Sequence, residues 1–256
     1  MRPLAFLILV QVVGCAGLPT DAQREASFQP YSALTVAGQP MAAFVMQRTA
    51  ILVVIEPDDS AAGRGFRYAL PPNERTVDLE QSLAVAIDRR GYFMTAYHCV
   101  EKGRKPIIVY RQNGKQRMAT PRVVAELRKL DLAILAVDAP LSAAFEWAAP
   151  GSFTRGETLL SGGADKGDFA GDMLSVRQRC LGGVLTKTSP VSGGFAVEHN
   201  VPIRPGDSGG PTLDVEGRLV GINSRGTLRP FAATVSTSFR PPPELVSRLI
   251  EADCAK

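Results

Sequence analysis

The sequence of 256 residues has few of the residues that build metal centres or disulfide frameworks. Its 4 cysteines and 2 histidines show no metal-ligand spacing, so we expect no metal site. The net charge is only +4, from 29 basic and 25 acidic residues, which argues against the clustered basic face of a nucleic-acid-binding protein. Beyond the N-terminal segment, no apolar run approaches the roughly 20 residues of a membrane-spanning helix. These absences disfavour metal-dependent, nucleic-acid-binding and membrane-spanning functions.

The N-terminal segment has the pattern of an export signal. Arg2 gives a positive start, and the apolar stretch at residues 4–13 is too short to span a bilayer. The stretch ends in Val12-Val13-Gly14-Cys15, which resembles a bacterial lipobox, where cleavage precedes the cysteine and its thiol takes a diacylglyceryl group. We therefore expect a lipoprotein signal peptide at residues 1–14 and lipidation of Cys15. An ordinary signal peptide with an incidental Cys15 is the alternative.

The residue after Cys15 bears on the location of an exported lipoprotein. Ala16 stands where an Asp would mark inner-membrane retention, which resembles lipoproteins sorted to the outer membrane. In a two-membrane bacterium, the protein would then be anchored on the periplasmic face of the outer membrane through Cys15.

Turn-forming residues divide the rest of the chain into short apolar runs, the pattern of an all-β protein. Gly and Pro number 24 and 19, and 45% of the residues are hydrophobic, which is ample for a core. Asp88-Arg89-Arg90-Gly91 and Asn113-Gly114 are hairpin signals, and the second is typical of a type I′ turn. The expected strands lie at residues 51–55, 83–87, 92–96, 107–110, 123–127, 132–137, 158–161, 173–180, 184–186, 195–198, 219–223 and 232–236.

The last residues have the pattern of a helix. Pro243 suits the first helical position, and the apolar residues that follow fall on one face. The expected organisation is a tether at 15–47, a folded domain at 48–240 with halves at about 48–139 and 152–240, and a C-terminal helix at 241–256.

Three short segments carry candidate catalytic chemistry. Thr95-Ala96-Tyr97-His98-Cys99 closes an expected strand with a histidine, and Asp131 opens an apolar strand, where its carboxylate needs a partner such as an imidazole N–H. Gly206-Asp207-Ser208-Gly209-Gly210-Pro211 is more specific. Its glycines permit a tight backbone, an exposed hydroxyl and N–H groups directed at an oxyanion. The sequence therefore predicts Ser208 as a nucleophile.

Together these segments resemble the trypsin and chymotrypsin clan of serine peptidases, with His98, Asp131 and Ser208 in the clan's chain order. The resemblance covers about residues 48–240 and is nearest to compact bacterial trypsin-like peptidases of the HtrA type. It implies two six-stranded antiparallel β-barrels with the active site between them. It also implies a serine endopeptidase that acts on proteins or peptides, with His98 as general base and Asp131 orienting the imidazole.

The resemblance also implies the remaining site residues. The backbone N–H groups of Gly206 and Ser208 would form the oxyanion hole, and no cofactor would be needed. Ser224, Arg225 and Gly226 would lie on the strand that binds the substrate backbone. Pro202 stands where a trypsin-like pocket has an Asp, so we expect cleavage after small or aliphatic residues. The alternatives are a catalytically silent binding scaffold and an esterase-like member of the fold.

The sequence departs from the clan in two respects. Cys99 lacks its usual bridging partner, since residues 82–94 contain no cysteine, and the pairing among Cys99, Cys180 and Cys254 stays open. The chain also has no activation site before the catalytic histidine, so we expect activity without zymogen cleavage. Asp207 must then find a partner within the chain, for which Arg204, Arg225 and local backbone N–H groups are the candidates.

Overall fold

The computed structural model describes residues 34–55, 66–68, 77–101, 104–164, 168–170, 173–175, 178–227 and 235–256. The expected signal peptide and Cys15 lie outside these residues. Within the described part of the chain, no helix is long and apolar enough to cross a membrane.

The first half of the chain forms an antiparallel sheet in the strand order β8-β7-β3-β5-β6-β10-β9, with β4 paired to β5. Asn113 and Gly114 connect two of its strands with φ values of 51° and 74°, as a type I′ turn requires. Gly91 closes the other predicted hairpin with a φ of 105°, and a Cβ there would lie 2.3 Å from the carbonyl oxygen of Val137. The strands are β3 (Thr49–Ile55), β4 (Phe66–Tyr68), β5 (Val77–Asp88), β6 (Tyr92–Ala96), β7 (Lys105–Gln112), β8 (Lys115–Ala119), β9 (Arg122–Leu127) and β10 (Leu132–Ala136).

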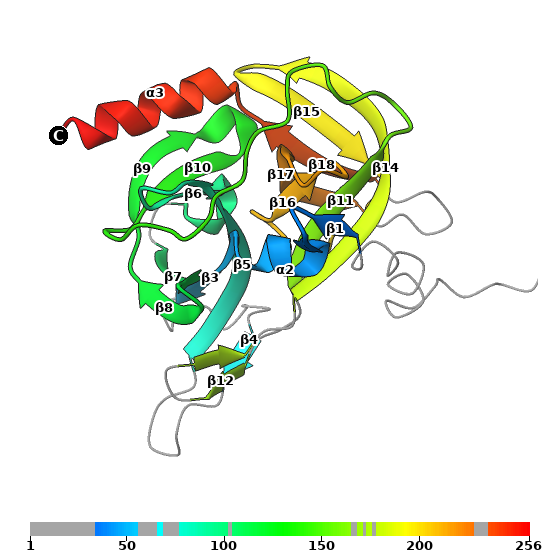
Figure 1. Cartoon of the computed structure of the whole chain (residues 1–256). Helices are drawn as coiled ribbons and strands as arrows, with labels where there is room; N and C mark the ends of the chain where they lie inside the picture. Colours follow the sequence, from blue (N-terminus) through cyan, green and yellow to red (C-terminus); the bar gives the residue numbers. More distant parts are fainter. Residues whose placement is uncertain are drawn as a thin grey trace, which may run out of the picture.

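The second half forms a closed barrel in the order β11-β14-β15-β18-β17-β16, and a separate hairpin joins β12 to β13 (Figure 1). The sequence predicts two strands at 173–180 and 184–186, but a single strand, β14, runs from Gln178 to Val191. Gly183 lies within this strand and not in a turn. A Cβ there would lie 2.5 Å from Asn200 Oδ1, so the glycine permits close approach of the neighbouring segment. The strands are β11 (Thr158–Ala164), β12 (Asp168–Ala170), β13 (Met173–Ser175), β14 (Gln178–Val191), β15 (Gly194–His199), β16 (Pro211–Leu213), β17 (Leu219–Thr227) and β18 (Val235–Arg240).

The expected all-β class is confirmed, as are one closed six-stranded barrel and the C-terminal helix. The first sheet differs from the expectation of a second closed barrel. Its outer strands β8 and β9 are not joined by a ladder among the described residues. One hydrophobic cluster nevertheless spans both halves, since Met94 and Ile134 of the first sheet pack in it with Leu160 and Ile222 of the barrel.

Residues 34–47, which fall within the expected tether, pack against the barrel. They form β1 (Thr35–Val36), β2 (Gln39–Pro40) and α2 (Met41–Met46). Met41, Phe44 and Val45 are buried in the shared core. The short helix was missed because six residues give too little periodicity to recognise.

The C-terminal helix α3 (Pro243–Cys254) follows the barrel but docks on the first sheet beside β9 (Figure 1). Val246 and Ile250 are buried, in agreement with the predicted face. Asp253 accepts two hydrogen bonds from Arg122, at 2.7 and 2.8 Å, and one from the hydroxyl of Tyr92 at 3.0 Å. The helix therefore ties the end of the second half to the first.

Candidate active site

His98 lies in a 3-10 turn, Tyr97–Cys99, which directly follows β6. Strands β6 and β10 are antiparallel neighbours, and Ala96 pairs with Leu132, so the end of one strand meets the start of the other. The N–H of His98 donates to Asp131 Oδ1 at 3.0 Å, and the N–H of Tyr97 donates to the Asp131 carbonyl at 2.8 Å. Local pairing therefore brings the predicted base and acid together.

The Asp131 carboxylate is the centre of the polar contacts in this region. Its Oδ2 lies 2.8 Å from His98 Nδ1 and accepts the hydroxyl of Ser224 at 2.5 Å. Burial acts to raise the pKa of Asp131, but the hydrogen bonds from His98 and Ser224 outweigh it and hold that pKa below its ordinary value. Asp131 has a left-handed backbone with a φ of 52°, a conformation unusual for a residue with a side chain. The carboxylate is thus ionised and held in a fixed orientation.

His98 is oriented by this carboxylate but remains open to a substrate. Its side chain is 43% exposed, whereas that of Asp131 is 13% exposed. The Asp131 carboxylate, followed by the Cys99 thiol, raises the pKa of His98 above its ordinary value. The imidazole is therefore well suited to receive a proton and hold it.

The predicted nucleophile lies on a turn that bridges the two halves of the molecule. The carbonyl of Ser208 accepts a hydrogen bond from the N–H of Leu83 on β5 at 2.8 Å. The N–H of Gly209 donates to the carbonyl of Asn223 on β17, also at 2.8 Å. Gly209 has a φ of 81°, and a Cβ there would lie 1.9 Å from the Leu83 carbonyl oxygen. Only glycine fits at this position, which explains part of the motif.

Asp207, which precedes the nucleophile, is buried and paired from within the chain. Arg179 Nη2 donates to its Oδ1 at 2.9 Å. The backbone N–H groups of Ala164 and Arg204 add hydrogen bonds at 3.2 and 2.9 Å. The expected backbone donors are confirmed, but sequence reasoning missed Arg179. No local pattern marks this arginine, because the barrel pairs β14 with β11 and so brings it to Asp207.

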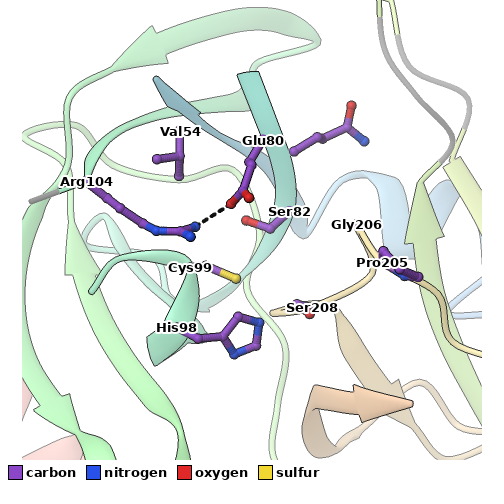
Figure 2. A pocket seen from close by; sticks show the side chains of 10 residues that line it. Val54, Glu80, Ser82, His98, Cys99, Arg104, Pro205, Gly206 and Ser208 are labelled. Atoms are coloured by element: carbon purple, nitrogen blue, oxygen red, sulfur yellow. Dashed lines mark hydrogen bonds and ion pairs between the residues drawn. The ribbon is translucent and has the colours of Figure 1, made fainter. Parts of the chain in front are cut away.

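His98 and Ser208 line one cavity of about 280 Å³, which opens between the first sheet and the nucleophile turn (Figure 2). Gly206, the second predicted oxyanion residue, also lines it and has a φ of 97°. Among the described residues, no hydrogen bond joins the Ser208 hydroxyl to the imidazole; hydrogen bonds of this kind often tighten only when a substrate binds.

The residues predicted to bind substrate divide into two groups. Ser224 is buried and bonds Asp131, so it supports the acid as well as lying on the predicted strand. Arg225 and Gly226 follow it on β17 and are exposed, while Pro202 is buried beneath the surface.

The three cysteines in the described part of the chain, Cys99, Cys180 and Cys254, are all free.

Comparison with known proteins finds serine proteases among the similar chains. The chain is 31% identical over 143 residues to the serine protease Do-like HtrA of Bacillus subtilis, covering 53% of this chain and 30% of that protein. It thus spans about a third of the length of the curated relatives it matches.

Two solved structures share the fold. The Rv3671c protease of M. tuberculosis in its active form has a TM-score of 0.59 and 16% identity, covering 85% of this chain and 89% of that one. The HtrA-type protease AlgW with a tripeptide has a TM-score of 0.55 and 18% identity, covering 83% and 62%. The family model for the trypsin-like peptidase domain matches residues 82–222, more than half of the chain. The chain therefore belongs to the trypsin-like peptidase family, with HtrA-type proteases among its relatives.

Proposed function

We propose that the protein is a serine endopeptidase that cleaves peptide bonds through an acyl-enzyme on Ser208. One observation carries the proposal: Asp131 Oδ2 lies 2.8 Å from His98 Nδ1, and His98 shares a cavity with Ser208. Family membership and the motif around Ser208 support the same reaction. The solved relative that holds a tripeptide supports protein or peptide substrates.

The proposed reaction follows from the position of each group. His98 takes the proton of the Ser208 hydroxyl as its oxygen attacks the scissile carbonyl, and Asp131 stabilises the imidazolium. The imidazolium then gives this proton to the leaving amine. In the second step, water attacks the acyl-enzyme and releases the acyl half of the substrate as a carboxylic acid. The raised pKa of His98 favours the imidazolium and so lowers the energy of the state that follows attack.

The developing oxyanion would be bound by the N–H groups of Gly206 and Ser208. The N–H groups of Asp207, Gly209 and Gly210 are used in internal hydrogen bonds, which fix the path of the turn. The buried ion pair of Arg179 and Asp207 fixes the turn to strand β14 of the barrel. Donors held in place in this way need no rearrangement during the reaction, which is the source of their catalytic value.

Cleavage after small or aliphatic residues is part of the proposal. Pro202, at the position of the expected pocket floor, carries no charge, and its neighbours Val201 and Ile203 are apolar and buried. Such a floor offers no counter-charge to a lysine or arginine side chain.

Anchoring outside the cytoplasm is also part of the proposal and rests on the lipobox-like segment before Cys15. A Cys15→Ala variant should leave the membrane fraction, because the acyl chains supply about 0.8 kcal/mol per buried CH₂. A wild-type protein that fractionates as freely soluble would contradict the anchor.

The test of the activity uses a fluorophosphonate probe followed by a peptide library. The probe should label the wild type, and Ser208→Ala should abolish both labelling and cleavage. His98→Ala should lose nearly all cleavage, and the double variant should be scarcely worse than either single variant, since the residues act as a unit. No labelling would favour a silent scaffold, and labelling without peptide cleavage would favour an esterase.

A further inference from the structure

Among the described residues, the lining of the cavity beside Ser208 lies to one side of the nucleophile. Besides the nucleophile turn, its lining comes from β3, β5, the turn that carries His98, and Arg104, all in the first half of the chain (Figure 2). Ser224, Arg225 and Gly226, which would hold the acyl half of a substrate, are not among the lining residues. The cavity therefore lies away from the strand that would bind the acyl half.

The chemistry of acyl transfer shows which half of a substrate would lie on this side of the site. His98 must reach the leaving amine to protonate it, so the leaving half of the substrate lies on the His98 side of Ser208. His98 and Cys99 form one wall of the cavity. The side chain of the residue after the scissile bond would consequently enter it.

The lining of the cavity includes a polar side chain that is itself buried. Ser82 is 6% exposed, and its hydroxyl has no hydrogen-bond partner among the described residues. A buried hydroxyl without a partner is unfavourable, and a bound group that hydrogen-bonds to it recovers that cost. Cys99, 3% exposed, adds a free thiol, since this chain lacks a bridge at that position. The cavity thus contains an unsatisfied hydroxyl that can both donate and accept.

An ion pair forms the remaining polar wall. Arg104 Nη1 donates to Glu80 Oε2 at 2.5 Å, and Figure 2 shows the pair beside Ser82 and above Cys99. Because the two charges already neutralise each other, a charged substrate side chain would have to compete for one of them. A neutral side chain with both a donor and an acceptor can bond Ser82 without disturbing the pair.

We propose that this cavity selects a carboxamide side chain, glutamine or asparagine, at the residue that follows the scissile bond. The proposal rests on the proposed peptidase function and adds a substrate class to it. Ser82 is the specificity-determining residue, Cys99 and the pair of Glu80 and Arg104 complete the polar lining, and Val54 supplies an apolar contact for the side-chain methylenes.

Acyl transfer tests the leaving side alone. An ester substrate forms the acyl-enzyme, and amino-acid amides then compete with water for it. The amine nitrogen attacks the ester carbonyl, the C–N bond forms and the bond to Ser208 Oγ breaks. His98 takes the proton of the amine and passes it to Ser208 Oγ. The ratio of aminolysis product to hydrolysis product therefore reports how well the amino-acid amide binds in this cavity. This ratio does not depend on the rate of acylation.

With the wild type, glutamine amide should capture the acyl-enzyme about tenfold better than leucine amide, lysine amide or glutamate amide. The Ser82→Ala variant should reduce the preference for glutamine over leucine to about one. Ser247→Ala, an exposed serine on α3, is the matched control and should keep the wild-type preference.

The outcomes separate this inference from the function on which it rests. If the ester gives an acyl-enzyme but leucine amide captures it as well as glutamine amide, the carboxamide preference is wrong and the peptidase proposal stands. A preference that survives in Ser82→Ala also overturns the role of Ser82. If no acyl-enzyme forms and the fluorophosphonate probe does not label Ser208, both proposals fail. The wild-type series decides the question even if the Ser82 variant does not fold.

Discussion

Arg179 on β14 donates a hydrogen bond of 2.9 Å to the carboxylate of Asp207, the residue before the proposed nucleophile. The side chains of the pair are 7% and 0% exposed. Gly163 on β11 makes room for the contact, because a Cβ there would lie 2.7 Å from Asp207 Oδ1. The guanidinium of Arg179, on a strand of the barrel, therefore anchors the nucleophile turn to the barrel.

Removal of Arg179 should destabilise the fold as well as impair catalysis. Arg179→Leu would leave Asp207 buried without its counter-charge, which costs about 3–5 kcal/mol when one partner of a buried pair is removed. Chemical denaturation should show this loss, and peptide cleavage should fall with it. Arg128→Leu is the matched control, since Arg128 pairs with Glu126 at the surface, where a pair contributes about 0–1 kcal/mol. Equal stability of the two variants would contradict the role assigned to Arg179.

The pH dependence of cleavage should reflect the pKa of His98. The Asp131 carboxylate, followed by Cys99, raises this pKa above its ordinary value of 6.5. Since a general base must be neutral, kcat/KM should rise with pH along an acidic limb whose midpoint lies above 6.5.

An Asp131→Asn variant provides the control for this pH profile. Loss of the carboxylate should move the midpoint toward more acidic pH and lower kcat by several orders of magnitude, because the imidazole tautomer is no longer fixed. A wild-type midpoint below 6.5, or a midpoint that Asp131→Asn leaves in place, would contradict the assignment.

The short motifs of the site and of the fold could be predicted from the sequence, because each depends only on neighbouring residues. The hexapeptide around Ser208 specifies the nucleophile turn, and Asn113-Gly114 specifies the hairpin between β7 and β8. The link from Ser224 to Asp131 could not be predicted, since these residues are far apart in the chain and meet only where the two halves join. Arg179 was missed for the same reason, and Ser82 because no motif marks a buried hydroxyl.

One glycine position also separates the sequence prediction from the structure. The expected strands at 173–180 and 184–186 leave a break at 181–183, but these residues lie within the continuous strand β14, where Gly183 permits close approach of Asn200 and Val201. Composition alone does not distinguish a glycine in a turn from a glycine that permits such an approach.

The second histidine should make the fold sensitive to acid. His199 is fully buried, its Nε2 lies 3.0 Å from Ser238 Oγ, and its Nδ1 has no partner among the described residues. Burial lowers its pKa from 6.5 to about 4. The unfolded chain therefore binds a proton that the folded chain does not, and the stabilisation present above pH 6.5 is lost as the pH falls to about 4.

This single group should account for on the order of 3 kcal/mol of the difference in unfolding free energy between pH 7 and pH 4. Denaturant titrations at both values measure it, and His199→Gln should show a smaller difference than the wild type because glutamine does not titrate. Equal differences in the two proteins would show that other groups cause the acid sensitivity.

The peptidase should be active without an activating cleavage, because Arg179 already supplies the positive charge that Asp207 needs. In the zymogens of the clan, this role falls to an amine that cleavage creates. A protein of residues 16–256 with a blocked or extended N-terminus, made in a protease-deficient host, should therefore cleave peptides at once. Mass spectrometry of the fluorophosphonate-labelled species should find that chain uncut. Met41 and Val45 lie in the core just before β3, so the segment that a zymogen would release is here part of the packing. Activity that appears only after a cut between residues 40 and 80 would show that the guanidinium does not replace the amine.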